Sequence, residues 1–319
     1  MAMSNYPNGF PTGVMIRNVP LAQTHPGNVY WLYNGTNLLP GQRGGSDANR
    51  GTFNSPFSTL AGALAQCVAG RGDVIFVKPG HAETVSSSTA LTMSIAGVAV
   101  VGLGTGTSRP KWTIDTANTA TINVSAADVS FQNVQIVGNF LSIAAAFTLS
   151  TAKNFTLQDV EIRDTSSVLN FLNAVKTTGA ANTADGLTII NSYWKGLGTT
   201  SVNAFVLTAN TIDSLVFKGN TAKLARTADA AQIVVTSGIL TNLDCGDNKV
   251  YTAQTATSAG SLINVGGTTS NGHVYRNYVQ TLTTASDLLF TTTVGLSAFD
   301  NRVTGVVGAS GFLIPAADS

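Results

Sequence analysis

A repeat of about 28 residues runs through the second half of this 319-residue chain. Seven segments each place an Asn or Asp between two short stretches that are rich in β-branched and aromatic residues. Each period holds at least two short strands and polar turns, and it leaves no room for a helix. Such a period predicts a β-solenoid, because one coil cannot bury its apolar face alone, whereas stacked coils share a continuous core.

The recurring Asn or Asp predicts a ladder along the stack. Both residue types tolerate a left-handed backbone at a bend, and an amide side chain can hydrogen-bond to the amide of the next coil. We expect one structural ladder, made of Asn133, Asp159, Asn191, Asn220, Asn248, Asn277 and Asn301. Weaker repeats continue upstream to about residue 72, so the sequence predicts roughly nine parallel coils over residues 72–319.

Residues 51–71 precede the coils, and their pattern predicts a short amphipathic helix. Ser55 or Asn54 can cap its N-terminus, with Pro56 at the first helical position. The apolar residues of one helix face follow at spacings of three and four: Phe57, Leu60, Ala61, Leu64 and Cys67. We expect this helix to cover the first coil, which would otherwise expose a strand edge and an apolar core.

Residues 1–50 are rich in Pro and Gly, with aromatic residues between them. This segment has no helical period and little strand pattern, so we expect an extended N-terminal arm that lies on a neighbouring protein. Its candidate partner-binding residues are aromatic: Phe10, Tyr30, Trp31 and Tyr33. The alternative is an arm that folds along its own solenoid.

Charged residues make up only 10% of the chain, and the formal net charge is +1. A nucleic-acid-binding protein normally carries a basic excess, and this chain has none. It also lacks an apolar stretch long enough to span a membrane. We therefore expect neither nucleic acid nor a membrane among the partners.

Residues 44–85 resemble the entrance of right-handed parallel β-helix proteins of the pectate-lyase-like superfamily. A Gly/Asp-rich turn in GSDANRG precedes the helix motif NSPFSTL, the strand GDVIF and the turn KPG. In that superfamily the same order of elements leads into the coils. The resemblance implies an all-β, right-handed parallel β-helix with a short capping helix. It implies little about chemistry, because function lies in sites that are grafted onto a fold.

The opening NYPNGFPTGV, followed by THPG and PGQRGGSD, resembles proteins encoded near the capsid gene of tailed bacteriophages. This resemblance implies a structural component of the virion. We therefore expect a capsid decoration or cement protein, assembled in the host cytoplasm and anchored by its arm on the major capsid protein or another virion protein. By analogy with phage β-helices, we expect a homo-oligomer, namely a trimer.

Few side chains of this sequence could carry catalysis. Cleavage of a glycosidic bond needs two carboxylates that flank it, and the best local set is Asp159, Glu161 and Asp164. Asp159 falls on a ladder position, and no second acid stacks in register with Glu161. No group of three acids recurs from coil to coil, so we expect no metal site. We expect no cofactor and no enzymatic activity.

The alternative function is that of a tailspike-like carbohydrate-binding protein or polysaccharide depolymerase. It predicts an exposed groove that holds Glu161, Asp164 and Lys195, with Tyr193 and Trp194 nearby as aromatic surfaces. Surface carboxylates within reach of an aromatic platform would favour this alternative, and their absence would favour the structural role.

Overall fold

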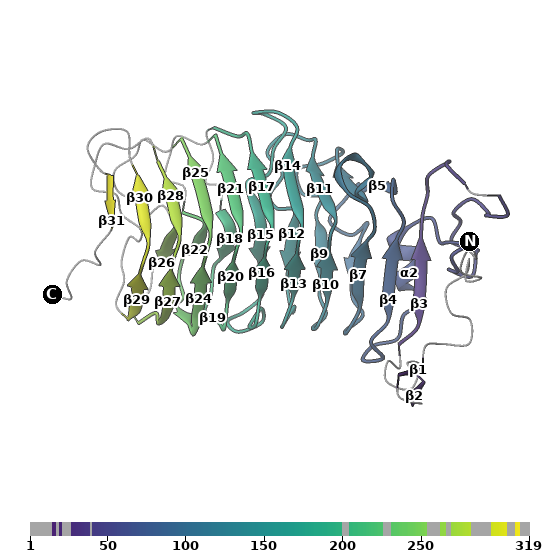
Figure 1. The fold of residues 1–319 in the computed structure, drawn as a ribbon, viewed down its shortest axis with the longest axis horizontal. Coiled ribbons are helices and arrows are strands. Elements are labelled where there is room, and N and C mark those ends of the chain that lie inside the picture. Colours follow the sequence, from purple (N-terminus) through teal and green to yellow (C-terminus); the bar gives the residue numbers. More distant parts are fainter. Residues whose placement is uncertain are drawn as a thin grey trace.

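The computed structural model shows a parallel β-solenoid with almost no helix (Figure 1). Successive coils lie side by side along the long axis of the molecule, from the purple N-terminal end to the yellow C-terminal end. The structure describes residues 15–16, 19–20, 27–38, 40–199, 204–225, 231–253, 262–265, 269–281, 295–304 and 310–312. No helix within these ranges has the length and apolar character that a membrane span requires.

Three sheets form the sides of the solenoid. Sheet 1 consists of β3 (Val29–Leu32), β4 (Val74–Val77), β7 (Ala99–Gly102), β10 (Ser130–Gln132), β13 (Thr156–Gln158), β16 (Thr188–Ile190), β20 (Val216–Lys218), β24 (Leu243–Gly246), β27 (Gly272–Tyr275) and β29 (Leu296–Phe299). Sheet 2 consists of β5 (Ala82–Thr84), β8 (Lys111–Ile114), β11 (Gln135–Gly138), β14 (Glu161–Asp164), β17 (Tyr193–Gly196), β21 (Thr221–Leu224), β25 (Lys249–Thr252), β28 (Tyr278–Gln280), β30 (Arg302–Thr304) and β31 (Ser310–Phe312). Sheet 3 consists of β6 (Thr92–Met93), β9 (Ile122–Val124), β12 (Phe147–Leu149), β15 (Asn173–Thr177), β18 (Ala204–Thr208), β22 (Ile233–Val235) and β26 (Ile263–Val265).

The remaining elements are short. Strands β1 (Met15–Ile16) and β2 (Val19–Pro20) pair antiparallel, and β19 (Ile212–Asp213) pairs parallel with β23 (Leu240–Thr241). Among the described residues, the helical elements are α2 (Leu60–Leu64) and the 3-10 turn η1 (Gly106–Ser108).

The predicted all-β parallel solenoid is confirmed. Seven coils contribute one strand to each of the three sheets, from β4–β5–β6 to β24–β25–β26. Two further coils, β27–β28 and β29–β30, contribute described strands to sheets 1 and 2. All pairs within the three sheets are parallel except the last one, between β30 and β31.

Alternation along each strand divides its side chains between the shared core and the outer face. The largest core residues are aromatic, and several pack edge to face between sheets 1 and 3. The ring centroids of Phe131 and Phe147 lie 5.3 Å apart, and those of Phe205 and Phe217 lie 5.2 Å apart. One continuous core therefore joins sheets from opposite sides of the coil, as stacked repeats require.

The capping helix is shorter than the sequence predicts and begins later. Its N-cap is Thr59, whose Oγ1 accepts a hydrogen bond from the Gly62 N–H at 3.0 Å, and not Ser55 or Asn54. The reason lies in the pairing of Phe57, whose N–H donates to Trp31 O while its carbonyl accepts from the Tyr33 N–H. This segment therefore covers the free edge of β3, and the chain becomes helical only after it.

Part of the predicted arm belongs to the solenoid. Strand β3 pairs in parallel register with β4, so sheet 1 begins at Val29. The side chain of Trp31 packs against Phe53 and Phe76, with ring centroids 4.9 and 5.3 Å away. Phe10 lies outside the described residues.

The seven predicted ladder positions occupy two neighbouring columns at the bend between sheets 1 and 2. Asn133, Asp159 and Asn191 have left-handed backbones, with φ of 52°, 54° and 50°. The same column continues with Gly219, Asp247, Arg276 and Asp300, which also have positive φ. Alignment of the segments by their Asn or Asp alone merges the two columns, because both columns use these residue types.

The other four positions lie one residue later and form a buried ladder. These are Asn220, Asn248, Asn277 and Asn301, each at most 2% exposed. The backbone N–H of each of the first three donates to the side-chain oxygen of the next, at 2.9–3.0 Å. The ladder therefore satisfies buried backbone donors at the bend.

Candidate functional site

Positively charged side chains gather on the outer face of sheet 2. The strands of this sheet carry six cationic residues: Lys111, Arg163, Lys195, Lys223, Lys249 and Arg302. Glu161 is the one carboxylate on the same outer face, because Glu83 and Asp164 point toward the inside. The near-zero net charge of the chain therefore conceals a strongly basic surface.

The register of the strands places these residues in rows. Arg163 pairs with Lys195 on the next strand, and Lys195 pairs with Lys223. Tyr251 and then Gln280 continue the same row on β25 and β28. Neighbouring strands are about 4.8 Å apart, so the row presents one functional group per coil.

The cations of this row differ in whether they are neutralised. Arg163 Nε lies 3.4 Å from the Glu161 carboxylate, which Arg109 also contacts at 3.4 Å. By contrast, Lys195 and Lys223 of this row, and Lys249 on the outer face of β25, form no salt bridge with any described residue. The basic character of the face therefore rests on these lysines.

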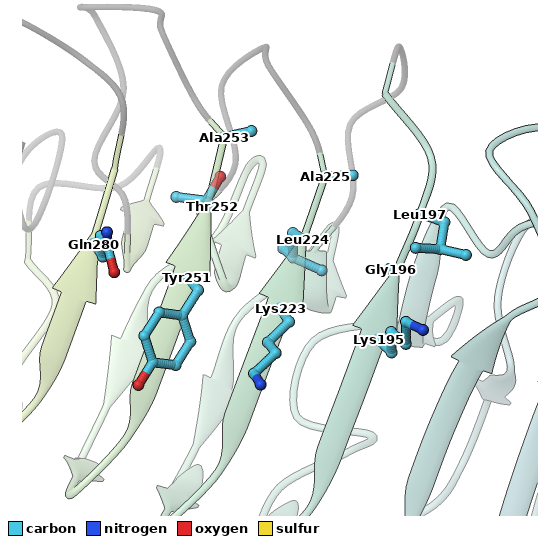
Figure 2. Close-up of a pocket in the computed structure, with 10 residues that line it drawn as sticks. All are labelled: Lys195, Gly196, Leu197, Lys223, Leu224, Ala225, Tyr251, Thr252, Ala253 and Gln280. Carbon is cyan, nitrogen blue, oxygen red and sulfur yellow. The ribbon is translucent and has the colours of Figure 1, made fainter. Parts of the chain in front are cut away.

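A groove of about 650 Å³ crosses four strands of sheet 2 at this row (Figure 2). Its lining residues are Lys195, Gly196, Leu197, Lys223, Leu224, Ala225, Tyr251, Thr252, Ala253 and Gln280. Figure 2 shows Lys195, Lys223 and Tyr251 on adjacent strands, with the apolar Leu197 and Leu224 beyond them toward the strand ends. The groove thus combines a charged side with an apolar side.

Aromatic rings line the C-terminal half of this face. The ring of Tyr251 lies 5.9 Å from that of Tyr278, and Lys223 Nζ lies 5.8 Å from the centroid of Tyr251. A tyrosine offers an apolar ring and a hydroxyl, which suits a ligand with both apolar faces and polar edges. The groove can therefore hold an elongated, polar and negatively charged ligand.

The predicted acidic residues do not come together. Asp159 lies in the left-handed column of the bend, whereas Glu161 lies on the outer face of β14. Asp164 is three residues further along the strand, so its side chain lies on the opposite face and is only 5% exposed. These three residues therefore do not form a pair of carboxylates that could flank one glycosidic bond.

Burial dominates the electrostatics of Asp164. It raises the pKa of this carboxyl to about 6, although the backbone N–H groups of Phe171, Leu197 and Gly198 lower it. Trp194, expected as an aromatic surface, is fully buried, whereas Tyr193 faces outward on the same strand. Within the described ranges, no three His, Cys, Asp or Glu side chains could hold a metal ion.

Three of the predicted partner-binding residues, Tyr30, Trp31 and Tyr33, lie at the other end of the molecule, in or next to β3 of sheet 1. Tyr33 is 5% exposed and donates from its hydroxyl to Asn37 O at 3.1 Å. The Tyr30 hydroxyl donates to Gln66 O at 2.9 Å, beside the capping helix. Partner binding by these residues stays a prediction.

Sequence reasoning missed the row in the groove, apart from Lys195. Lys223, Tyr251 and Gln280 follow Lys195 at intervals of 28, 28 and 29 residues, which is the length of one coil. That interval was the available signal. It becomes visible only when the segments are aligned by their strands and not by their Asn and Asp residues.

No family model matches this chain, and no curated protein is similar to it. Among solved structures, a rhamnogalacturonan lyase is similar with a TM-score of 0.54 and 15% identity, covering 87% of this chain and 74% of the lyase. Two structures of a GH136 lacto-N-biosidase from Eubacterium ramulus match with TM-scores of 0.41 and 0.40 and identities of 10% and 9%. They cover 88% of this chain and 68% of the biosidase.

These comparisons correct one expectation. The sparse, scattered carboxylates led us to expect no enzymatic activity, but a solved structure that resembles this chain is an enzyme, the rhamnogalacturonan lyase. The absence of a paired acid set does not separate this chain from enzymes of similar fold, because chemistry resides in the local site. At 15% identity the likeness shows the fold, which is the parallel β-solenoid also found in a rhamnogalacturonan lyase.

Proposed function

We propose that this protein binds an extended acidic polysaccharide along the groove of sheet 2. The observation that carries the proposal is the row of Arg163, Lys195 and Lys223, followed in register by Tyr251 and Gln280. Lys195 and Lys223 form no salt bridge with any residue that the structure describes, so their charges are available to an external anion. The groove is long and open across several coils, which suits a polymer.

The chemistry of the groove favours sugar acids over other polyanions. The spacing of the strands is close to the length of one sugar unit in an extended chain, so successive carboxylates can meet successive coils. The tyrosine rings and the apolar wall can contact sugar faces while the lysines and Gln280 contact polar edges. The name of the similar lyase refers to a polysaccharide, which supports this class of ligand.

Binding of polygalacturonate tests the proposal, with neutral dextran and single-stranded DNA as comparison ligands. We expect polygalacturonate to bind at low ionic strength and dextran to bind weakly, because charge attraction contributes most of the affinity. Equal binding of dextran would contradict the proposal. Tighter binding of DNA would assign the face to nucleic acid instead. The ultraviolet absorbance of unsaturated sugars and the release of reducing ends then report any cleavage.

The double variant Lys195→Ala/Lys223→Ala tests the position of the site. We expect polygalacturonate binding to fall about tenfold or more, because each lysine loses a charge-assisted contact. The matched control is Lys153→Ala/Lys176→Ala, which removes the same charge from other faces of the solenoid. An equal loss in both variants would show that only net charge matters and would exclude the groove.

The virion role expected from the sequence stays a prediction, together with its capsid partner, trimer and location. The two roles are compatible, because the groove lies on sheet 2 whereas Tyr30, Trp31 and Tyr33 lie in or next to β3 of sheet 1.

A further inference from the structure

A small cavity lies where β3, β4 and β7 of sheet 1 end, near the N-terminal end of the solenoid (Figure 1). Its volume is about 220 Å³, and it shares no lining residue with the groove of sheet 2. The rings of Trp31, Tyr33 and Phe53 line it together with Leu103. Lys78 is the one charged side chain among the described residues that line it. The cavity is thus a largely aromatic space with a single cation.

Lys78 is held at this cavity by its backbone. It directly follows β4, its N–H donates to Leu32 O at 3.0 Å, and its carbonyl accepts from the His81 N–H at 3.2 Å. The residue is only 7% exposed. Its Nζ lies 4.0 Å from the centroid of the Phe53 ring and 5.8 Å from that of the Tyr33 ring. The ammonium group is therefore placed against two rings of the cavity wall.

This buried ammonium group lacks a counter-ion. Lys78 forms no salt bridge within the part of the chain that the structure describes. It has three N–H groups, and Phe53 O is the one described acceptor that takes a hydrogen bond from them. Burial lowers the pKa of Lys78, because a charge that is removed from water without an opposite charge is costly. The cavity therefore presents a cation with two N–H groups available to a ligand.

We infer that this cavity binds a small carboxylic acid with an apolar ring. The carboxylate accepts hydrogen bonds from Lys78 Nζ and neutralises its charge, while the ring lies among the aromatic side chains of the wall. An apolar cavity of about 150 Å³ holds benzene, so this cavity has room for one ring and a carboxylate. The wall is preformed, because the Tyr33 hydroxyl donates to Asn37 O at 3.1 Å and fixes the ring.

Calorimetric titration of the full chain with phenylacetate tests the inference, at pH 7 and constant ionic strength. We expect a dissociation constant of about 1 mM or lower, which is ordinary for a ligand of this size. Benzyl alcohol keeps the ring without the charge, and acetate keeps the charge without the ring. We expect each of them to bind at least about tenfold more weakly than phenylacetate.

Each of these ligands can overturn the inference. Equal binding of benzyl alcohol would show that the ammonium group does not select the ligand, and equal binding of acetate would show that the rings do not. Tighter binding of galacturonate would assign the cavity to a sugar acid in place of an apolar ring. Absence of phenylacetate binding would exclude the site altogether. None of these outcomes bears on polygalacturonate binding at sheet 2, because the two sites share no residue.

Two variants test the position of the site. Lys78→Met keeps an apolar side chain but removes the ammonium group, so we expect phenylacetate to bind at least about tenfold more weakly while benzyl alcohol binds as before. Leu103→Trp keeps the ammonium group and fills the cavity, so both ligands should lose binding. The matched control Lys176→Met removes the same charge from sheet 3 and should change neither.

The pair of ligands separates a direct contact from general damage to the fold, because damage weakens both. Equal loss of both ligands in Lys78→Met would therefore overturn the charge contact. Phenylacetate binding that survives in Leu103→Trp, or that falls equally in Lys176→Met, would place the ligand elsewhere and overturn the site.

Discussion

The bend between sheets 1 and 2 is built differently in the two halves of the solenoid. In the C-terminal coils the buried column holds Asn220, Asn248, Asn277 and Asn301, which hydrogen-bond from coil to coil. In the earlier coils the same column holds Val134 and Val160, both buried. Ser192 lies at the boundary and accepts from the Val160 N–H at 3.2 Å. One backbone path is thus stabilised by amides in one half and by apolar packing in the other.

The difference shows where this fold places its buried polar groups. Each ladder asparagine immediately precedes a strand of sheet 2, and those strands include β21, β25 and β28 of the groove. Hydrogen bonds are directional, whereas apolar contacts tolerate small shifts. The ladder therefore fixes the register of the coils on which the row of lysine, tyrosine and glutamine depends.

The largest expected effect comes from removal of a ladder amide. Asn248→Val leaves the Asn220 N–H without its acceptor, and it removes the donor that Phe217 O and Asn277 Oδ1 accept from. We expect the free energy of unfolding to fall by about 3–5 kcal/mol, since several buried groups lose partners. Denaturant unfolding measures this. Asn123→Val, on the outer face of sheet 3, should change it by less than about 0.5 kcal/mol. Similar losses in both variants would show that the buried ladder contributes no more to stability than an amide on the outer face.

The second prediction concerns pH, because Asp164 is a buried titratable residue of the earlier coils. Its pKa is raised from 3.8 to about 6, so its contribution to stability is fully present below pH 3.8 and is lost as the pH rises through 6. We expect this contribution to fall by about 2 kcal/mol between pH 4 and pH 7. Unfolding at several pH values measures it, with Asp164→Asn as the reference that lacks the slope. An unchanged slope in that variant would assign the pH dependence elsewhere.

The boundary residue gives a smaller effect. Ser192→Ala leaves the buried Val160 N–H without its side-chain acceptor, and we expect a loss of about 2 kcal/mol. Ser192→Asn should restore the acceptor and extend the ladder by one coil, with a change of less than about 1 kcal/mol. If both variants lose the same stability, an asparagine at position 192 cannot extend the ladder. The two halves of the bend would then differ in more than the side chain at this position.

The sequence predicts the solenoid well because every coil repeats the same strand pattern, so the evidence accumulates over the length of the chain. It predicts the ladder only in part, because Asp159 and Asn220 look equivalent although they lie one residue apart in the coil. The sequence does not predict the groove for the same reason, since an alignment that is wrong by one residue moves Lys223 from the outer face of the strand to the inner one. Asp164 faces inward because it lies three residues after Glu161 on one strand. The sequence does not show that the strand extends from Glu161 to Asp164.

The smallest effect is expected in the left-handed column, where Gly219 stands among Asn and Asp residues and has φ of 64°. A Cβ at this position would lie 2.5 Å from the flexible Asn191 Oδ1, which can move aside. We expect Gly219→Asn to lower the free energy of unfolding by less than about 1 kcal/mol, because Asn tolerates this backbone. Gly219→Val, which does not, should cost about 1 kcal/mol more. Thermal unfolding of the two variants measures the difference. Equal losses would mean that hydrogen bonding and not backbone conformation selects the residues of this column, and the two columns would then obey one rule.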